Sequence, residues 1–319
     1  MTRQAYRRLT RYGFFMLFVL APPLDLFRLD LTLGHFILLG QDWTLGLDPF
    51  LAGQAGPGYA VWSLLWRGLL PIVLVVGGGL LIAWQYGRLY CGWLCPHFSV
   101  VESINALLLR ATGKPTLWEP KPVTRYPDGQ PITPSRAWWP LVVVAVVGFA
   151  LLWAVTLLTY LLPPALVWGN LLDLELSRNQ LLFITVATVV FIIEFTFARH
   201  LFCRYVCAAG LFQSYAWMAN RKALVVDFDI HRARSCADCF AACDTVCPMR
   251  LKPRSLKRQM FACTQCTACI DACETVQRNN PAGSLLHWVK GAQAWDKSRT
   301  FGRGRSCPSR IPPTAKTGG

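Results

Sequence analysis

Four segments of this 319-residue chain are apolar and about as long as a membrane-spanning helix. They cover residues 12–27, 68–86, 138–162 and 180–198, and a helix needs about 20 residues to cross a bilayer core. Hydrophobic residues make up 54% of the chain and charged residues only 15%, which excludes an ordinary soluble domain. We therefore predict a membrane α-helical protein with a four-helix transmembrane bundle.

Basic residues flank the apolar segments and predict their orientation. The net charge is +15, with four arginines before Tyr12 and only Arg178 in the segment 163–179. Because Lys and Arg accumulate in cytoplasmic loops, we expect both termini in the cytoplasm and the protein in a bacterial cytoplasmic (inner) membrane. No basic run accompanies a recognisable nucleic-acid-binding fold. Membrane lipid is therefore an expected partner and nucleic acid is not.

Eight cysteines lie close together in the last third of the chain. Their two motifs have nearly the spacing that holds a pair of 4Fe–4S cubanes: Cys236-x2-Cys239-x3-Cys243-x3-Cys247-Pro248 and Cys263-x2-Cys266-x2-Cys269-x3-Cys273. In two-cluster ferredoxins, the fourth cysteine of each motif binds the cluster of the other motif. We therefore predict two sites: a first cluster held by Cys236, Cys239, Cys243 and Cys273, and a second held by Cys263, Cys266, Cys269 and Cys247.

The first motif departs from the usual spacing. It has three residues between its second and third cysteines where two are usual, so the first cluster could be distorted, differently ligated or easily lost. A pair of structural zinc sites is the alternative, because C-x2-C pairs also suit tetrahedral zinc. The C-x3-C-Pro ending at Cys247 and Pro248 favours iron, since zinc does not need it.

A change in composition near residue 200 divides the chain. We expect a transmembrane region over residues 1–200 and a small cytoplasmic α+β two-cluster ferredoxin-like domain over residues 201–289, where the reducing cytoplasm keeps thiols free. Residues 225–228 could form a strand that leads into the first motif. Residues 290–319 are rich in Gly, Pro and Arg and are expected to form a flexible basic tail. Cys307 in this tail is expected to be a free thiol.

Two further cysteine pairs follow the second and fourth apolar segments. Three residues separate Cys91 from Cys95, and three separate Cys203 from Cys207. Residues four apart share a helix face, so the four thiols could converge at the cytoplasmic side of the membrane. Such a site could hold copper or iron, or form a redox-active disulfide. The alternative is that these cysteines are small buried hydrophobic side chains.

Three ionisable residues near these pairs are further candidates. Glu194 lies inside the fourth apolar segment, and an ionisable group at such a position is a candidate for function. It could take protons from a quinol; alternatively, it could extend to the interface or pair with Arg199 or Arg88. His97 and His200 could be metal ligands, or they could be ordinary residues of the interface.

These motifs resemble those of polytopic ferredoxin-type membrane proteins, the group of NapH, NosR and CcoG (FixG, RdxA). YCGWLCP at residues 90–96 is similar to a membrane-edge motif of the group, and Glu102 matches the acidic residue that follows it. LFQS at 211–214, DACETV at 271–276 and PAGSLLHW at 281–288 most resemble the CcoG branch. The extra residue of the first motif departs from that branch, as does the lack of its further helix and immunoglobulin-like domain. In addition, Ala208 stands where the branch has proline.

The resemblance implies a membrane core of four helices with a two-cluster ferredoxin domain. We predict a membrane-bound iron–sulfur protein that passes electrons between a membrane donor, such as quinol, and a redox partner protein. A copper-reducing assembly factor for a haem–copper oxidase, working with the oxidase assembly machinery, is one alternative. A non-redox scaffold with structural clusters is another. The residues expected to take part in redox chemistry at the membrane are Cys91, Cys95, Cys203, Cys207 and Glu194.

Overall fold

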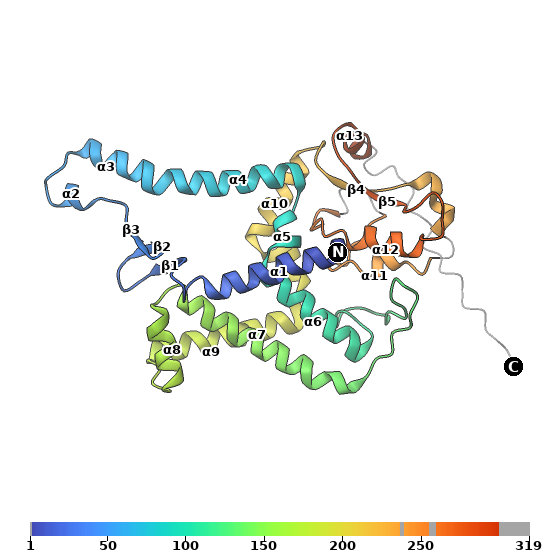
Figure 1. Ribbon diagram of the computed structural model, residues 1–319, viewed down its shortest axis with the longest axis horizontal. Coiled ribbons are helices and arrows are strands. Elements are labelled where there is room, and N and C mark those ends of the chain that lie inside the picture. The colour runs from blue at the N-terminus through green and yellow to red at the C-terminus, as the bar shows by residue number, and fades with distance from the viewer. Residues whose placement is uncertain (1, 237–238, 255–259, 300–319) are drawn as a thin grey trace.

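Helices make up most of the computed structural model, which describes residues 2–236, 239–254 and 260–299 (Figure 1). Three helices are long and apolar enough to cross a membrane: Pro57–Tyr86, Arg136–Thr159 and Arg178–Ala198. They correspond to the last three predicted segments. Each combines an α-helix with short 3-10 or π-helical turns: α3 (Pro57–Leu64), η1 (Leu65–Leu69) and α4 (Leu70–Tyr86); η2 (Arg136–Trp138) and α7 (Trp139–Thr159); α9 (Arg178–Ile193) and η3 (Glu194–Ala198).

The first predicted segment differs from the structure. Helix α1 spans Arg3–Leu20, so it begins and ends earlier than the predicted range 12–27. The reason is that Arg7 and Arg11, one turn apart, are buried within the helix and both bind Glu102. α1 is not one of the three candidate spans, and a fourth membrane helix therefore stays a prediction.

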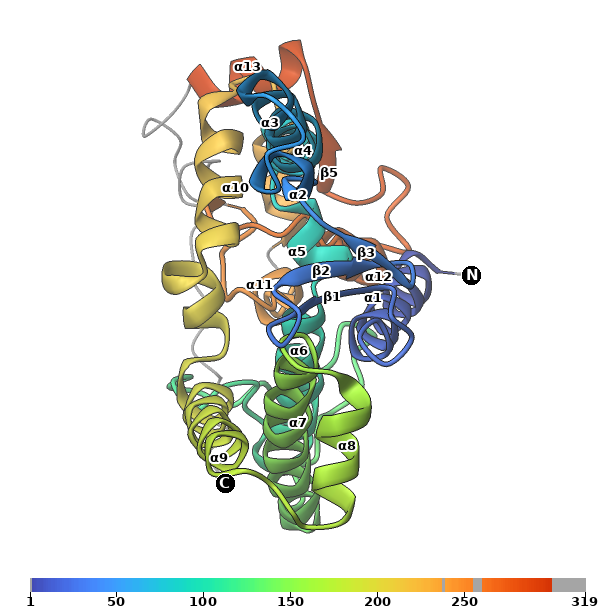
Figure 2. The same ribbon diagram turned by 90° about the vertical axis from the view of Figure 1, so that its left-hand side faces the viewer.

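The long helices do not pack together as the predicted four-helix bundle. α7 packs along α9, with α6 (Pro96–Thr112) against α7 and α1 against α6, whereas α4 lies apart from α7 and α9 in both views and packs on α10 (Ala208–Ala219) (Figures 1 and 2). None of the 18 residues in the apolar stretch of Pro57–Tyr86 is buried in the protein. Lipid tails are as apolar as such a helix, so it needs no protein neighbour along its length.

A small sheet lies at the end of the helices opposite the cysteine-rich part of the chain (Figure 1). It is antiparallel in the order β1-β2-β3, and it is followed along the chain by a short helix. Their bounds are β1 (Phe27–Asp30), β2 (His35–Leu38), β3 (Gln41–Trp43) and α2 (Asp48–Leu51). Helix α8 (Pro164–Leu172) connects α7 with α9 at the same end.

The cysteine-rich part contains short elements around a two-stranded sheet. β4 (Val225–Phe228) pairs antiparallel with β5 (Leu286–Val289), and β4 confirms the predicted strand. Between these strands lie η5 (Ile230–Cys236), α11 (Ala242–Thr245) and α12 (Ala268–Val276).

The predicted flexible tail begins with a helix instead. α13 spans Ala292–Arg299, and Ala294 is buried with Trp217, Val225 and Val289. These apolar contacts explain why this segment folds onto β4 despite its composition. Residues 300–319, with Cys307, lie outside the described residues.

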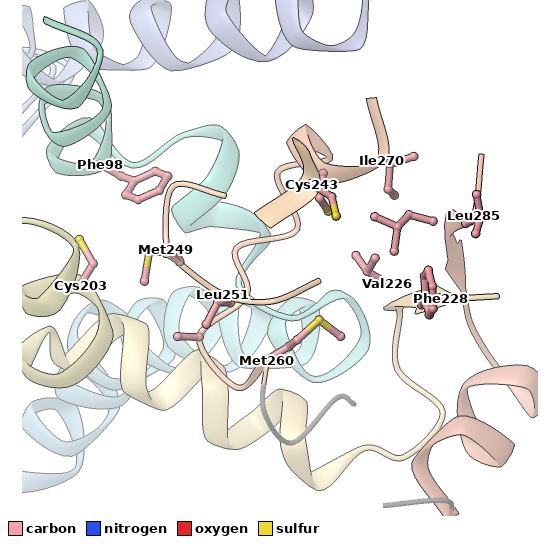
Figure 3. Packing of buried hydrophobic residues seen from close by; sticks show 13 residues of the cluster. Phe98, Cys203, Val226, Phe228, Cys243, Met249, Leu251, Met260, Ile270 and Leu285 are labelled. Atoms are coloured by element: carbon pink, nitrogen blue, oxygen red, sulfur yellow. The ribbon is translucent and has the colours of Figure 1, made fainter. Parts of the chain in front are cut away.

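One hydrophobic cluster joins the helical part to the cysteine-rich part (Figure 3). Phe98 from α6 and Cys203 from η4 (Phe202–Val206) belong to the same buried cluster as Met249, Val226 and Leu285. The membrane-edge elements therefore share a core with the segment that carries the eight cysteines.

Candidate functional site

Two hollows in the cysteine-rich part are each lined by four cysteines. The first is lined by Cys236, Cys239, Cys243 and Cys273. The second is lined by Cys247, Cys263, Cys266 and Cys269. The structure thus brings together the same two sets that the interleaved motif predicts, and we call these hollows the first and second cluster sites.

The extra residue of the first motif is accommodated in a tight turn. Ala241, between Cys239 and Cys243, has φ +58°, in the left-handed region that residues with a side chain rarely adopt. Helix α11 begins directly after it and carries Cys243. The added residue therefore removes none of the motif's three cysteines from the hollow.

Backbone strain also shapes the loop of the second site. Gln265 and Thr267, on either side of Cys266, have φ of +53° and +62°. Such conformations cost about 1–3 kcal/mol each and are concentrated at functional sites. The tightly turned loop places Cys263, Cys266 and Cys269 at the lining of one hollow.

Each site offers four cysteine thiols, the ligand set of a 4Fe–4S cluster. Among the residues that the structure describes, no three His, Cys, Asp or Glu side chains form a group that could hold a single metal ion. The backbone N–H of Leu251 donates to Sγ of Cys247 at 3.3 Å, and that of Leu285 to Sγ of Cys273 at 3.4 Å. Hydrogen bonds to sulfur help to set a cluster's potential.

The described cysteines are all free thiols, and several are strongly desolvated. Burial raises the pKa of Cys247 to about 11 and that of Cys263 to about 12. Without metal, these thiols are protonated near neutral pH. Because metals bind thiolates, loading iron at the second site must release protons.

The loop of the second site lies directly on the membrane-edge helix α5 (Leu89–Trp93). The indole N–H of Trp93 donates to the Gln265 carbonyl at 3.0 Å. A Cβ atom added to Gly92 would lie 2.1 Å from the carbonyl oxygen of Thr264, so only glycine permits this approach. Helix α1 completes the contact, since the side chain of Gln4 donates to the Cys266 carbonyl at 3.0 Å.

Replacing Trp93 with Phe tests this contact in isolation. The ring would keep its packing against Tyr6, but the hydrogen bond to Gln265 would be lost. We expect the free energy of unfolding to fall by about 1 kcal/mol, seen as a lower midpoint of thermal unfolding. Trp168→Phe, in α8, is the control. Equal shifts in both variants would contradict a specific role for the Trp93 bond.

The four membrane-edge cysteines occupy equivalent positions in two helical units. Cys95 directly precedes α6 and Cys207 directly precedes α10, while Cys91 and Cys203 are buried in α5 and η4. Burial, together with the nearby Cys91 and Cys207, raises the pKa of Cys95 to about 12. The pairs therefore lie near one another, but no three of these thiols surround a single ion and none is in a disulfide. Copper or iron at this place stays a prediction, and we assign no metal to these thiols.

The side chain of Glu194 contacts His97, a partner that the sequence does not indicate, and it also interacts electrostatically with Arg199. Its Oε2 atom lies 2.9 Å from Nε2 of His97, and Nδ1 of His97 lies 3.6 Å from Sγ of Cys203. Arg88 is fully buried and donates instead to the Cys203 carbonyl at 2.6 Å. The sequence singles out Glu194 and His97 separately, but nothing in its spacing indicates that they meet.

His200 is buried among arginines. Burial, together with Arg199, Arg250 and Arg204, lowers its pKa to about 4. The imidazole is therefore neutral near pH 7. Among the described residues, it belongs to no group of three side chains that could hold a metal ion.

Comparison with known proteins gives one family model and two relatives. A model described as a 4Fe-4S binding domain matches residues 68–115 and 179–224. The putative electron transport protein YccM of Escherichia coli (strain K12) is 27% identical over 189 residues, 58% of this chain and 48% of that protein. The ferredoxin-type protein NapH of the same strain is 25% identical over 218 residues, 65% of this chain and 67% of that protein. The chain thus spans about half the length of YccM. No solved structure matches significantly.

The two matched segments have the same architecture. Each contains a long apolar helix, a C-x3-C pair and a second helix: α4, Cys91, Cys95 and α6 in one, and α9, Cys203, Cys207 and α10 in the other. Both precede the eight-cysteine stretch. Neither relative is a CcoG protein, so closeness to that branch stays a prediction. The chain is therefore a homologue of YccM and of the ferredoxin-type protein NapH, and two of its segments match the 4Fe-4S binding domain model.

Proposed function

We propose that this protein is a membrane-bound electron-transfer protein that binds two 4Fe–4S clusters and passes electrons from a membrane-dissolved hydroquinone to a redox partner protein. One observation carries the proposal: the eight clustered cysteines line two hollows, four to each. The names of the relatives, an electron transport protein and a ferredoxin-type protein, agree with it.

The positions of the two sites in the protein would set the order in which electrons pass through them. Bound clusters would supply one-electron chemistry. The loop of the second site touches α5 at Gly92 and Trp93, which favours this site as the one nearer the membrane donor. The first site would then be the one nearer the redox partner.

The contacts of α1 support the proposed orientation. Arg3, at the start of α1, binds Asp271 at 2.8 Å, so the N-terminal end lies beside the cysteine-rich part. Tyr12, Met16 and Leu20 are exposed apolar residues on the same helix. We include α1 as a fourth membrane helix, with both chain ends on the cytoplasmic side of a bacterial inner membrane.

Iron and sulfide analysis with low-temperature electron paramagnetic resonance tests the proposal. Protein purified without oxygen and reduced with dithionite should show two interacting 4Fe–4S signals. Zinc in place of iron would overturn the proposal. Clusters that are present but that no membrane donor can reduce would instead support a structural scaffold.

A further inference from the structure

Three side chains form a buried chain of contacts between the membrane helices and the membrane-edge cysteines. Oε2 of Glu194 lies 2.9 Å from Nε2 of His97, and Nδ1 of the same ring lies 3.6 Å from Sγ of Cys203. Glu194 and Cys203 are 8% and 7% exposed. The three residues come from η3, α6 and η4, so the tertiary fold rather than local sequence brings them together.

The backbone around this chain of contacts is irregular. Glu194 begins the π-helical turn η3, and Cys203 lies in another, η4. Between these turns, Arg199 has φ +37°. π-helical turns are rare and frequently mark functional sites, and left-handed backbone at a residue with a side chain stores strain that function can explain.

Aromatic rings enclose the imidazole on the membrane side. The ring centre of His97 lies 5.9 Å from Trp153, 5.6 Å from Phe195 and 5.2 Å from Phe202. Trp153 also contacts Phe191 at 5.9 Å, and Phe191 lines an open apolar hollow that α9 forms beside Leu157 of α7. A hydrocarbon chain in that hollow would lie beside the aromatic wall of the Glu194–His97 pair.

Glu194 keeps an unused acceptor atom in this apolar setting. Its Oε1 atom is buried and has no hydrogen-bond partner. The titratable groups that interact with Glu194 are His97 from α6, Arg199 after η3, and Cys203 from η4, whereas α7 and α9 contribute the rings of Trp153 and Phe191. A buried carboxylate with a free oxygen is costly, and a hydroxyl donor would satisfy it.

We propose that Glu194 and His97 form the proton-accepting site for the hydroquinone donor, with its hydroxyl group on Oε1 of Glu194 and its tail in the apolar hollow beside α9. The inference rests on the proposed function and names the residues that act at its donor end. The hydroquinone becomes the quinone, losing two protons and two electrons. The hydroxyl on Oε1 gives its proton to the Glu194–His97 pair, and the second hydroxyl, on the opposite side of the ring, gives its proton to water. The electrons leave one at a time for the oxidised clusters of the two cluster sites.

Glu194→Gln tests the proposal because it keeps the shape but cannot accept the proton. The whole protein in lipid nanodiscs is mixed with decyl-ubiquinol or menadiol, and bleaching of cluster absorbance is followed as a function of pH. General base catalysis contributes about 10²–10⁴-fold, so we expect at least about 100-fold slower bleaching. His97→Gln, which keeps a donor to Glu194 but no relay, should shift the pH profile. Iron content and reduction by dithionite should stay unchanged in both variants.

Glu175→Gln, at an exposed carboxylate beyond the other end of α9, is the matched control and should behave as wild type. A Glu194→Gln rate within twofold of wild type, with the same pH profile, would overturn the proposal. The proposal would also be overturned if dithionite reduced the wild-type clusters but decyl-ubiquinol and menadiol did not. In that case, the proposed electron-transfer function would still stand. If no cluster forms, the proposed function fails.

The Glu194–His97 site can still be tested in that case by the binding of heptyl-hydroxyquinoline N-oxide, a hydroquinone analogue. Weaker binding to Glu194→Gln than to wild type supports the site, and equal or absent binding overturns it.

Discussion

Replacing Cys273 with Ser is expected to remove the first cluster and leave the second, although Cys273 belongs to the second motif. Cys273 lines the hollow of the first motif's Cys236, Cys239 and Cys243, and a serine hydroxyl is a poor ligand for iron that thiolates hold. Iron content should fall by about half, and the interaction between the two paramagnetic signals should disappear. Electron transfer from the membrane to an external acceptor should stop.

Double variants identify which cysteines share a cluster. If Cys273 and Cys239 serve the same cluster, the double serine variant should contain as much iron as either single variant. Cys247 lines the other hollow, so Cys239→Ser combined with Cys247→Ser should contain almost none. The opposite pattern would mean that each motif binds its own cluster and would reject the interleaved arrangement.

Gly92→Ala is expected to displace the loop of the second site from the membrane edge. The new Cβ atom would lie 2.1 Å from the Thr264 carbonyl oxygen and 3.3 Å from the Thr264 side chain. The obstacle is backbone, so α5 or the loop must move, and overpacking of this kind typically costs about 1–3 kcal/mol. Because Thr264 directly follows Cys263, the second cluster should become labile. Iron loss during dilution and slower reduction by the membrane donor would measure this.

Gly148→Ala provides the matched control in α7. Nothing lies within 4 Å of its added Cβ atom, and alanine favours a helix over glycine by about 1 kcal/mol. This variant should keep its iron and be no less stable than wild type. If Gly92→Ala also kept its iron and its donor reactivity, the close contact between α5 and the loop would not be needed for the second site.

Hydropathy predicted the three candidate membrane spans well and the first helix poorly. The sequences of α4, α7 and α9 are almost continuously apolar, and hydropathy detects such runs directly. In α1, the arginines that the sequence places before a membrane helix are part of the helix itself. They are stabilised by Glu102 of α6, a partner about 90 residues away. Local patterns cannot show such a contact.

The sequence likewise predicted some features of the candidate site and not others. Cysteine spacing predicted the two sets of four that line the hollows, because ligand loops are local and their interleaving is a known pattern. It could not predict that the second site lies on α5, nor that His97 lies between Glu194 and Cys203. Those contacts depend on how α5 lies on the second-site loop and on how α6, η3 and η4 pack, and local sequence shows neither.

The contact between Gln4 and the second-site loop has a consequence for biosynthesis. The amide of Gln4 donates to the carbonyl of Cys266, 262 positions later in the chain. During translation, α1 leaves the ribosome long before its partner loop exists, and distant contacts of this kind form late. We therefore expect the second site to close only after the membrane helices have been inserted. Iron delivery would then act on a nearly finished protein rather than on a nascent chain.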